Sequence, residues 1–247
     1  MPWNILAITF TNKAANEMKE RIETLVGSDI SKDIWIGTFH SICLRILRKH
    51  IESLGYEKNF SIYDVSEQKQ IIKQIIKRNG IESKVITDKY VQSRISSAKN
   101  KMIMPEEFEM QNKDYYGKYV AEIYHEYQQR LKENNALDFD DIINYTIKLL
   151  KNNPDICEEY AKKFRYILVD EYQDTNMSQF ELIRLLSYIH NNVTVVGDND
   201  QGIYSFRGAE ISNILEFEKD YNGAKIVKLE QNYRSTKNIL QVANDII

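Results

Sequence analysis

Two neighbouring carboxylates directly follow an apolar run in the second half of the sequence. Asp170 and Glu171 come after residues 166–169, Tyr-Ile-Leu-Val. A carboxylate at the end of a buried strand can hold Mg²⁺, mostly through water, because this ion favours octahedral oxygen ligands. A second carboxylate beside it can orient or deprotonate an attacking water molecule. The pair is a candidate for hydrolytic phosphoryl transfer, although an Asp-Glu pair after a strand is also common without a catalytic role.

A second polar segment follows the apolar run at residues 193–196. It contains Gln201 in a glycine turn, and a neutral amide can hydrogen-bond a phosphate oxygen or the attacking water. Tyr204, Phe206 and Arg207 follow within six residues. Aromatic faces beside a cation suit stacking on exposed bases. The segment is typical of an element that contacts a nucleotide at one end and nucleic acid at the other; an ordinary strand, loop and helix with core aromatics is the alternative.

These polar segments need strands that end beside one another. Short strands are expected from the apolar runs at residues 4–10, 166–169, 193–196 and 224–229. Thr11 and Asn12 are N-cap residue types that would begin a helix after the first run. Strands alternating with helices predict an α/β fold with a parallel sheet, covered on both faces, that binds ligands at the carboxyl ends of its strands.

The middle of the sequence has a different character, because nearly every segment from residue 41 to residue 164 has helical periodicity. One apolar stripe steps by three or four positions through Tyr116, Val120, Ile123, Tyr127 and Leu131. We expect a mainly helical subdomain at 41–164, inserted between two parts of an α/β domain at 1–40 and 165–247.

The composition is typical of a soluble globular protein. Of the 247 residues, 43% are hydrophobic and 28% charged, which excludes a disordered or collagen-like chain. Two cysteines, Cys43 and Cys157, and the lack of a stretch of about 18 apolar residues predict a cytoplasmic protein without a membrane partner. Residues 65–105 hold nine basic and three acidic residues. A solvated helix face explains this excess more simply than a polyanion partner.

Six segments occur in an order that identifies a family. They are ITFTNKAA at 8–15, GTFHS at 37–41, LDFDD at 137–141, VDEYQDTN at 169–176, GDNDQGIYSFRGA at 197–209 and LEQNYRS at 229–235. In these segments the chain resembles the UvrD/Rep family of superfamily 1 DNA helicases, from residue 5 to about residue 240. The resemblance implies a partial RecA-like P-loop NTPase sheet that carries a helical insert. It also implies ATP and Mg²⁺ as cofactors.

The resemblance implies a role for each residue of the nucleotide site. Asp170 would bind Mg²⁺, Glu171 would activate water, and Gln201 would contact the γ-phosphate. Arg234 would be an arginine finger, whose permanent planar charge suits the negative charge that develops on the transferred phosphoryl group.

The resemblance also implies a track for single-stranded DNA. Four rings would lie along it: Phe10, His40, Tyr204 and Phe206. Four other side chains would contact the DNA backbone or shape the track: Thr9, Asn12, Thr38 and Arg207. Phe206 stands where the family usually has Trp, which would weaken stacking without removing it. Gly202 stands where Ser is common, which makes that turn looser.

Some of these matched residues have structural alternatives. Lys13 would equally be a solvated charge at the start of a helix, and His40 a structural histidine. Asp138, Asp140 and Asp141 are expected to cap the following helix rather than to act in catalysis, since acidic residues stabilise a helix N-terminus.

The phosphate-binding loop G-x-x-x-x-G-K-[ST] does not occur in this sequence. The family has it before residue 8 of the present numbering, so we expect a helicase fragment that begins after this loop and ends before the second RecA-like half. The whole protein is expected to move 3′ to 5′ on single-stranded DNA and to unwind duplexes from single/double-strand junctions. This chain alone is expected not to hydrolyse ATP, and its incomplete sheet to be distorted or to pair with a second copy.

Two other functions stay open at this stage: a non-catalytic nucleic-acid-binding or interaction module, and a subunit of a helicase-nuclease. The sequence does not choose between repair, replication restart and plasmid roles.

Overall fold

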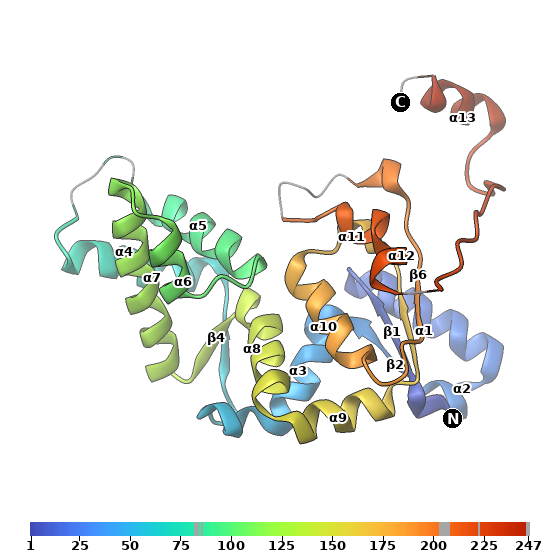
Figure 1. Ribbon diagram of the computed structural model, residues 1–247, viewed down its shortest axis with the longest axis horizontal. Coiled ribbons are helices and arrows are strands. Elements are labelled where there is room, and N and C mark those ends of the chain that lie inside the picture. Colours follow the sequence, from blue (N-terminus) through green and yellow to red (C-terminus); the bar gives the residue numbers. More distant parts are fainter. Residues whose placement is uncertain (82–83, 85, 203–207, 222, 246–247) are drawn as a thin grey trace.

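The computed structural model describes residues 1–81, 84, 86–202, 208–221 and 223–245 (Figure 1). A four-stranded sheet contains β1 (Ile5–Thr9), β2 (Trp35–Thr38), β5 (Tyr166–Val169) and β6 (Val193–Val195), and a two-stranded sheet pairs β3 (Ser61–Tyr63) with β4 (Ala136–Asp138). The helices before β5 are α1 (Asn12–Val26), α2 (Ser28–Ser31), α3 (Phe39–His50), α4 (Val65–Arg78), α5 (Asp88–Asn100), α6 (Pro105–Gln111), α7 (Tyr115–Glu133), α8 (Phe139–Asn152) and α9 (Pro154–Lys163). Those after it are α10 (Met177–Ser187), α11 (Ser212–Leu215), α12 (Phe217–Asp220) and α13 (Lys237–Asn244).

The larger sheet has the strand order β2-β1-β5-β6, and all its pairs are parallel. Ala7 lies opposite Ile36 on one side and Leu168 on the other, and Leu168 lies opposite Thr194. This confirms the expected α/β class, the parallel sheet and the strands expected from the runs at 4–10, 166–169 and 193–196. Pairing is regular in these strands, so the distortion expected of an incomplete sheet is not found there.

The strand expected at residues 224–229 is wrong. These residues belong to no strand, and Leu229 is 82% exposed. An apolar run forms a strand only where a neighbouring strand supplies partners for its backbone N–H and C=O groups. The segment instead runs away from the sheet towards α13 (Figure 1), where no described strand pairs with it.

The two faces of the larger sheet are covered unequally. Leu6, Ile8, Ile167 and Val169 are buried against α3, α8 and α10 in one hydrophobic cluster. On the other face α1 packs against β1 and β2. Beyond α1 this face is open, since Leu168 remains 42% exposed. The expected coverage of both faces therefore holds for only part of the sheet.

A second hydrophobic cluster lies within the helical region. Its apolar side chains come mostly from α4, α5, α6 and α7. These four helices lie together on the left of Figure 1. The stripe expected on the long helix is buried there at Val120, Ile123, Tyr127 and Leu131. Helices α8 and α9, which lie within residues 41–164, and α3, which begins at Phe39, contribute to the cluster beneath the sheet instead. No helix of the described residues combines the length and the apolar character needed to cross a bilayer.

Candidate functional site

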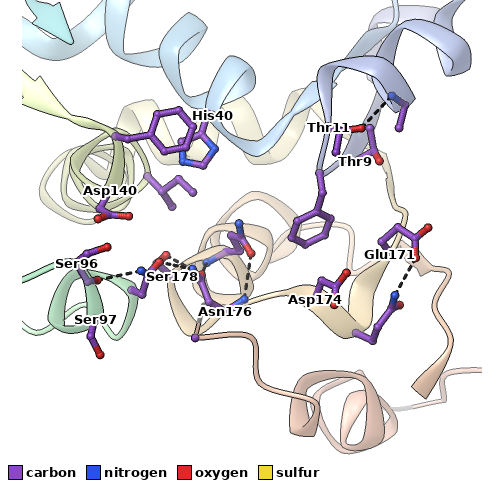
Figure 2. A pocket seen from close by; sticks show the side chains of 18 of the residues that line it. Thr9, Thr11, His40, Ser96, Ser97, Asp140, Glu171, Asp174, Asn176 and Ser178 are labelled. Carbon is purple, nitrogen blue, oxygen red and sulfur yellow. Dashed lines mark hydrogen bonds between the residues drawn. The ribbon is translucent and has the colours of Figure 1, made fainter. Parts of the chain in front are cut away.

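A cleft of about 740 Å³ opens at the carboxyl ends of β1 and β5 (Figure 2). Its walls come from the β1–α1 turn, the first residues of α3 and α8, one face of α5 and the segment that follows β5. This is the position at which parallel sheets collect ligands.

Three strand-to-helix turns shape one wall of this cleft. Thr11, Thr38 and Asp138 are the N-cap residues of α1, α3 and α8, and each accepts a hydrogen bond from a backbone N–H three residues later. Each cap lies at, or just after, the carboxyl end of a strand. Beside these caps lie the three aromatic side chains of the wall: Phe10, His40 and Phe139.

The aromatic wall is neutral and partly open to solvent. The rings of His40 and Phe139 stack with centroids 3.7 Å apart and planes inclined by 22°. Phe139 is 53% exposed. Burial lowers the pKa of His40 to about 4, so its imidazole is uncharged at neutral pH. Phe10 packs edge-on against Phe39, with centroids 5.5 Å apart. Such a surface suits stacking on planar, unpaired bases.

The opposite wall is a polar face of α5. Ser93, Ser96 and Ser97 line the cleft there, one helical turn or less apart. Ser96 hydrogen-bonds the carboxyl of Asp140, whose pKa is raised to about 6 by burial and by the neighbouring Asp138. At the end of this helix Asn100 Oδ1 accepts a hydrogen bond of 2.6 Å from Asn176, which ties α5 to the segment after β5.

The expected hydrolytic carboxylates lie at the end of β5. Glu171 has φ 52° and ψ 42°, a left-handed conformation that is rare for residues other than glycine and is typical of functional sites. Its exposed carboxylate lines the cleft and accepts a hydrogen bond of 2.8 Å from Gln173. Asp170 is half-buried, and burial followed by the charge of Glu171 raises its pKa.

A hydrogen-bond chain connects Glu171 with Gln201 across two neighbouring strands. The Gln173 side chain donates to Glu171, and its Oε1 accepts from the backbone N–H of Asp198 at 3.1 Å. The Asp198 carboxylate accepts from the Gln201 amide at 2.7 Å. Gly197 leaves room for this chain, since a Cβ there would lie 2.6 Å from Gln173 Oε1 and would displace that side chain. Gln173 and Asp198 were not among the expected site residues, although both stand in the matched segments.

The structure brings together only some of the expected site residues. Those that line the cleft are Thr9, Phe10, His40, Glu171 and Gln201. Those that do not are Asn12, Thr38, Asp170 and Arg234. Tyr204, Phe206 and Arg207 lie outside the described residues. Their roles stay predictions.

The placements of the residues away from the cleft have local reasons. Thr38 is buried and caps α3, and Asn12 is exposed in the first turn of α1. Arg234 is exposed in the segment that leads away from the sheet to α13, so the structure does not place it beside Glu171 (Figure 1). Lys13 is exposed and pairs with Glu17 at 3.9 Å. Phe139 belongs to the matched segment at 137–141 but was not among the expected site residues, yet as the first residue of α8 it lines the cleft.

Two polar atoms in the cleft, Thr9 Oγ1 and Asp174 Oδ1, are buried and have no hydrogen-bond partner among the residues that the structure describes. Thr9 is only 1% exposed. A buried polar group without a partner is costly, so these atoms suit a ligand that brings hydrogen-bonding groups of its own.

The fit to Mg²⁺ and to a nucleotide is partial. The described residues contain no group of three or more His, Cys, Asp or Glu side chains placed to hold a metal ion. Asp170 beside Glu171 provides oxygen ligands of the type that Mg²⁺ accepts, but this ion keeps several waters and takes further ligands from phosphates. The pair therefore fits a metal that arrives with a nucleotide better than a metal held by protein alone.

Comparison with known proteins agrees with this geometry. A family model described as the UvrD/REP helicase N-terminal domain matches residues 1–222. The chain is 52% identical over 246 residues to the ATP-dependent DNA helicase PcrA of Bacillus subtilis strain 168, and 51% identical to proteins of the same name from Staphylococcus epidermidis strain RP62A and Staphylococcus aureus strain Mu50. These matches cover 100% of this chain and 33% or 34% of the relatives, so it spans about a third of their length. The chain belongs to the UvrD/REP helicase family.

Proposed function

We propose that this chain is the part of an ATP-dependent DNA helicase that binds single-stranded DNA and carries the hydrolytic carboxylates. The observation that carries the proposal is a single cleft in which a neutral aromatic wall lies beside the Glu171–Gln173–Asp198–Gln201 chain. Its curated relatives are named as ATP-dependent DNA helicases.

In this proposal unpaired bases stack on Phe10 and on the His40–Phe139 pair. Stacking of one base on an aromatic side chain contributes about 1–3 kcal/mol and tolerates any base. The Thr9 hydroxyl would form one hydrogen bond with the DNA strand, which would give this buried group a partner. Tyr204, Phe206 and Arg207 would extend the same track.

On the nucleotide side, Asp170 would hold Mg²⁺ through water and Glu171 would orient the attacking water molecule. Bound ATP and Mg²⁺ would supply the phosphoryl group and its charge neutralisation. Gln201 would contact the γ-phosphate, and Arg234 would serve as arginine finger once its segment lies over the site. A change in the position of the Gln201 side chain would then alter the position of Glu171, because Asp198 and Gln173 connect the two through hydrogen bonds.

The wider expectations belong to the same proposal. The α/β domain would comprise 1–40 and 165–247, with 41–164 inserted and α3, α8 and α9 packed under the sheet. The protein would act in the cytoplasm, move 3′ to 5′ and unwind duplexes from single/double-strand junctions.

One observation favours a second function for the chain taken alone. The sequence lacks G-x-x-x-x-G-K-[ST], the loop whose backbone amides and lysine cradle phosphates. The chain by itself would then bind nucleic acid without turning over ATP.

Binding of fluorescent oligothymidine, compared with a blunt duplex of the same length, tests the proposal. Fluorescence anisotropy at low salt should show tighter binding of the single strand, weakened as salt rises. Equal affinity for both DNAs, or no binding, would contradict it.

A further inference from the structure

Lys99 is the most deeply buried cation of the described chain. It stands in the last turn of α5 and is 0% exposed. Its ammonium lies 2.6 Å from Asp138 Oδ2 and 2.7 Å from Asp141 Oδ1. Removing an ammonium from water costs several kcal/mol unless carboxylates pair with it. The two ion pairs therefore fix where the end of α5 lies relative to these two aspartates.

The same two aspartates form the start of α8. Asp138 is its N-cap residue, and Asp138 and Asp141 make a reciprocal capping box through their side chains and backbone N–H groups. Asp138 also accepts a hydrogen bond of 2.9 Å from the Tyr127 hydroxyl. Lys99 thus binds both side chains that determine where the helix begins.

The next residue after Asp138 is Phe139, whose ring stacks on His40 in the cleft. A second contact holds the two helices together farther along, because Asn144 donates to the backbone carbonyl of Lys99 at 2.8 Å. Phe139 is half exposed, so packing alone constrains its ring only in part. Its position depends on the start of α8, which Lys99 holds.

We propose that Lys99 is a positioning residue, whose ion pairs with Asp138 and Asp141 hold Phe139 against His40 in the cleft. This inference rests on the proposed binding of single-stranded DNA to that wall. Lys99 itself, being fully buried, touches no DNA. This role differs from simple stabilisation of the fold. Through its contacts with Asp138 and Asp141, Lys99 in α5 would determine how the ring of Phe139 in α8 lies against His40.

The first test uses the chain with Lys99→Met, which keeps the length of the side chain and removes its charge. The imidazole of His40 is followed by NMR titration, because its low pKa reflects its burial in this wall. In molecules that remain folded, loss of the Phe139 contact should raise the pKa of His40 by more than one unit. A purely stabilising lysine would leave that value near 4 in the folded fraction.

The second test is a double-mutant cycle on oligothymidine binding. Lys99→Met and Phe139→Ala should each weaken binding about tenfold, and the double variant should lose less than twofold more, because both changes remove the same contact. Lys89→Met removes an exposed charge from the same helix and should change the affinity less than twofold. Fully additive losses, or an unmoved His40, would overturn the proposal.

Lys99→Met leaves two buried carboxylates without their cation and can prevent folding. The triple variant Lys99→Met, Asp138→Asn, Asp141→Asn removes all three charges and keeps a capping side chain at position 138. It should fold and show the same rise in the pKa of His40, whereas wild-type values would contradict the inference. If the wild-type chain binds no single strand, the proposed function fails, while the His40 titration still decides the role of Lys99.

Discussion

The imidazole of His40 and the ring of Phe139 stack with centroids 3.7 Å apart, although they stand in the first turns of two different helices in different parts of the sequence. Each ring comes one or two residues after a polar N-cap side chain that fixes a strand-to-helix turn, Thr38 before His40 and Asp138 before Phe139. The site is therefore built from turns at the sheet edge, and the predictions below test what those turns position.

Phe139→Ala should weaken binding of single-stranded DNA about tenfold, since loss of one stacked base costs about 1–3 kcal/mol. Stability should change little, because the ring is half exposed. Anisotropy titration and urea unfolding measure the two quantities. Tyr115→Ala removes an exposed ring from α7, outside the cleft, and serves as the matched control. Equal effects of the two variants would contradict the assignment.

Asp140→Asn should strengthen binding at pH 7.5 by roughly two- to fivefold, because it removes a negative charge from a cleft that accepts a polyanion. The pKa of Asp140 is raised to about 6. Wild-type affinity should therefore rise as the pH falls from 7.5 to 5, and this rise should be smaller in the variant. Asp141, whose pKa burial also raises, is paired with Lys99 in both proteins, so any contribution from it is common to the two pH profiles. Asp155→Asn, in α9, is the control; an identical pH profile for wild type and Asp140→Asn would contradict the prediction.

His40 should make folding less favourable in acid. Its folded-state pKa of about 4 lies below the ordinary value of 6.5, so the unfolded chain binds the proton more readily. The stability advantage of wild type over His40→Gln should be largest above pH 6.5 and should shrink as the pH falls towards 4. Urea unfolding of both proteins at several pH values measures the difference between their free energies of unfolding. The aspartates titrate in both proteins, so their contributions to the pH dependence cancel in that difference. A difference that does not vary with pH would show that His40 is not buried.

Gly197→Ala should destabilise the chain by about 1–3 kcal/mol, because the new Cβ would lie 2.6 Å from Gln173 Oε1 and 2.7 Å from Ile214 Cδ1. Gly202→Ala is the matched control, since among the described residues no atom would lie closer than 3.4 Å to its Cβ. Urea unfolding of the two variants distinguishes them. Similar free energies of unfolding for the two variants would contradict this prediction and would mean that the Gln173 side chain moves aside at little cost.

ATP turnover by this chain should be negligible with or without single-stranded DNA, because Glu171 and Gln201 have no phosphate-binding loop beside them in this sequence. A coupled assay of phosphate release at low salt measures it. DNA-stimulated turnover that Glu171→Gln abolishes would contradict this expectation and would mean that the chain holds nucleotide in another way.

Sequence pattern predicted three of the four strands of the parallel sheet, β1, β5 and β6, because apolar runs and cap residues are local signals, but it did not predict β2. It could not predict that residues 224–229 form no strand, since pairing depends on a free neighbouring edge. Nor could sequence pattern predict that Phe139 is exposed in the cleft while other apolar residues of α8 are buried. Periodicity does not show which end of a helix lies at a cleft.

Gln173, Asp198 and Lys99, which connect separate segments of the chain, were not predicted for a related reason. Gln173 meets Asp198 only because β5 and β6 lie side by side in the sheet. Lys99 looks like any surface lysine in a helix until Asp138 and Asp141 are brought to it from another segment. Such contacts arise from tertiary structure, which single-sequence reasoning reaches only through a resemblance.

The most direct test of the account is the fluorescence of oligothymidine that carries a single 2-aminopurine, titrated with the wild-type chain and with the Phe10→Ala, Phe139→Ala double variant. Stacking on the aromatic wall should change the 2-aminopurine emission on binding of the wild type, and the double variant should lose both that change and most of the affinity. The same emission change and affinity in both proteins would place the DNA elsewhere and contradict the proposed cleft.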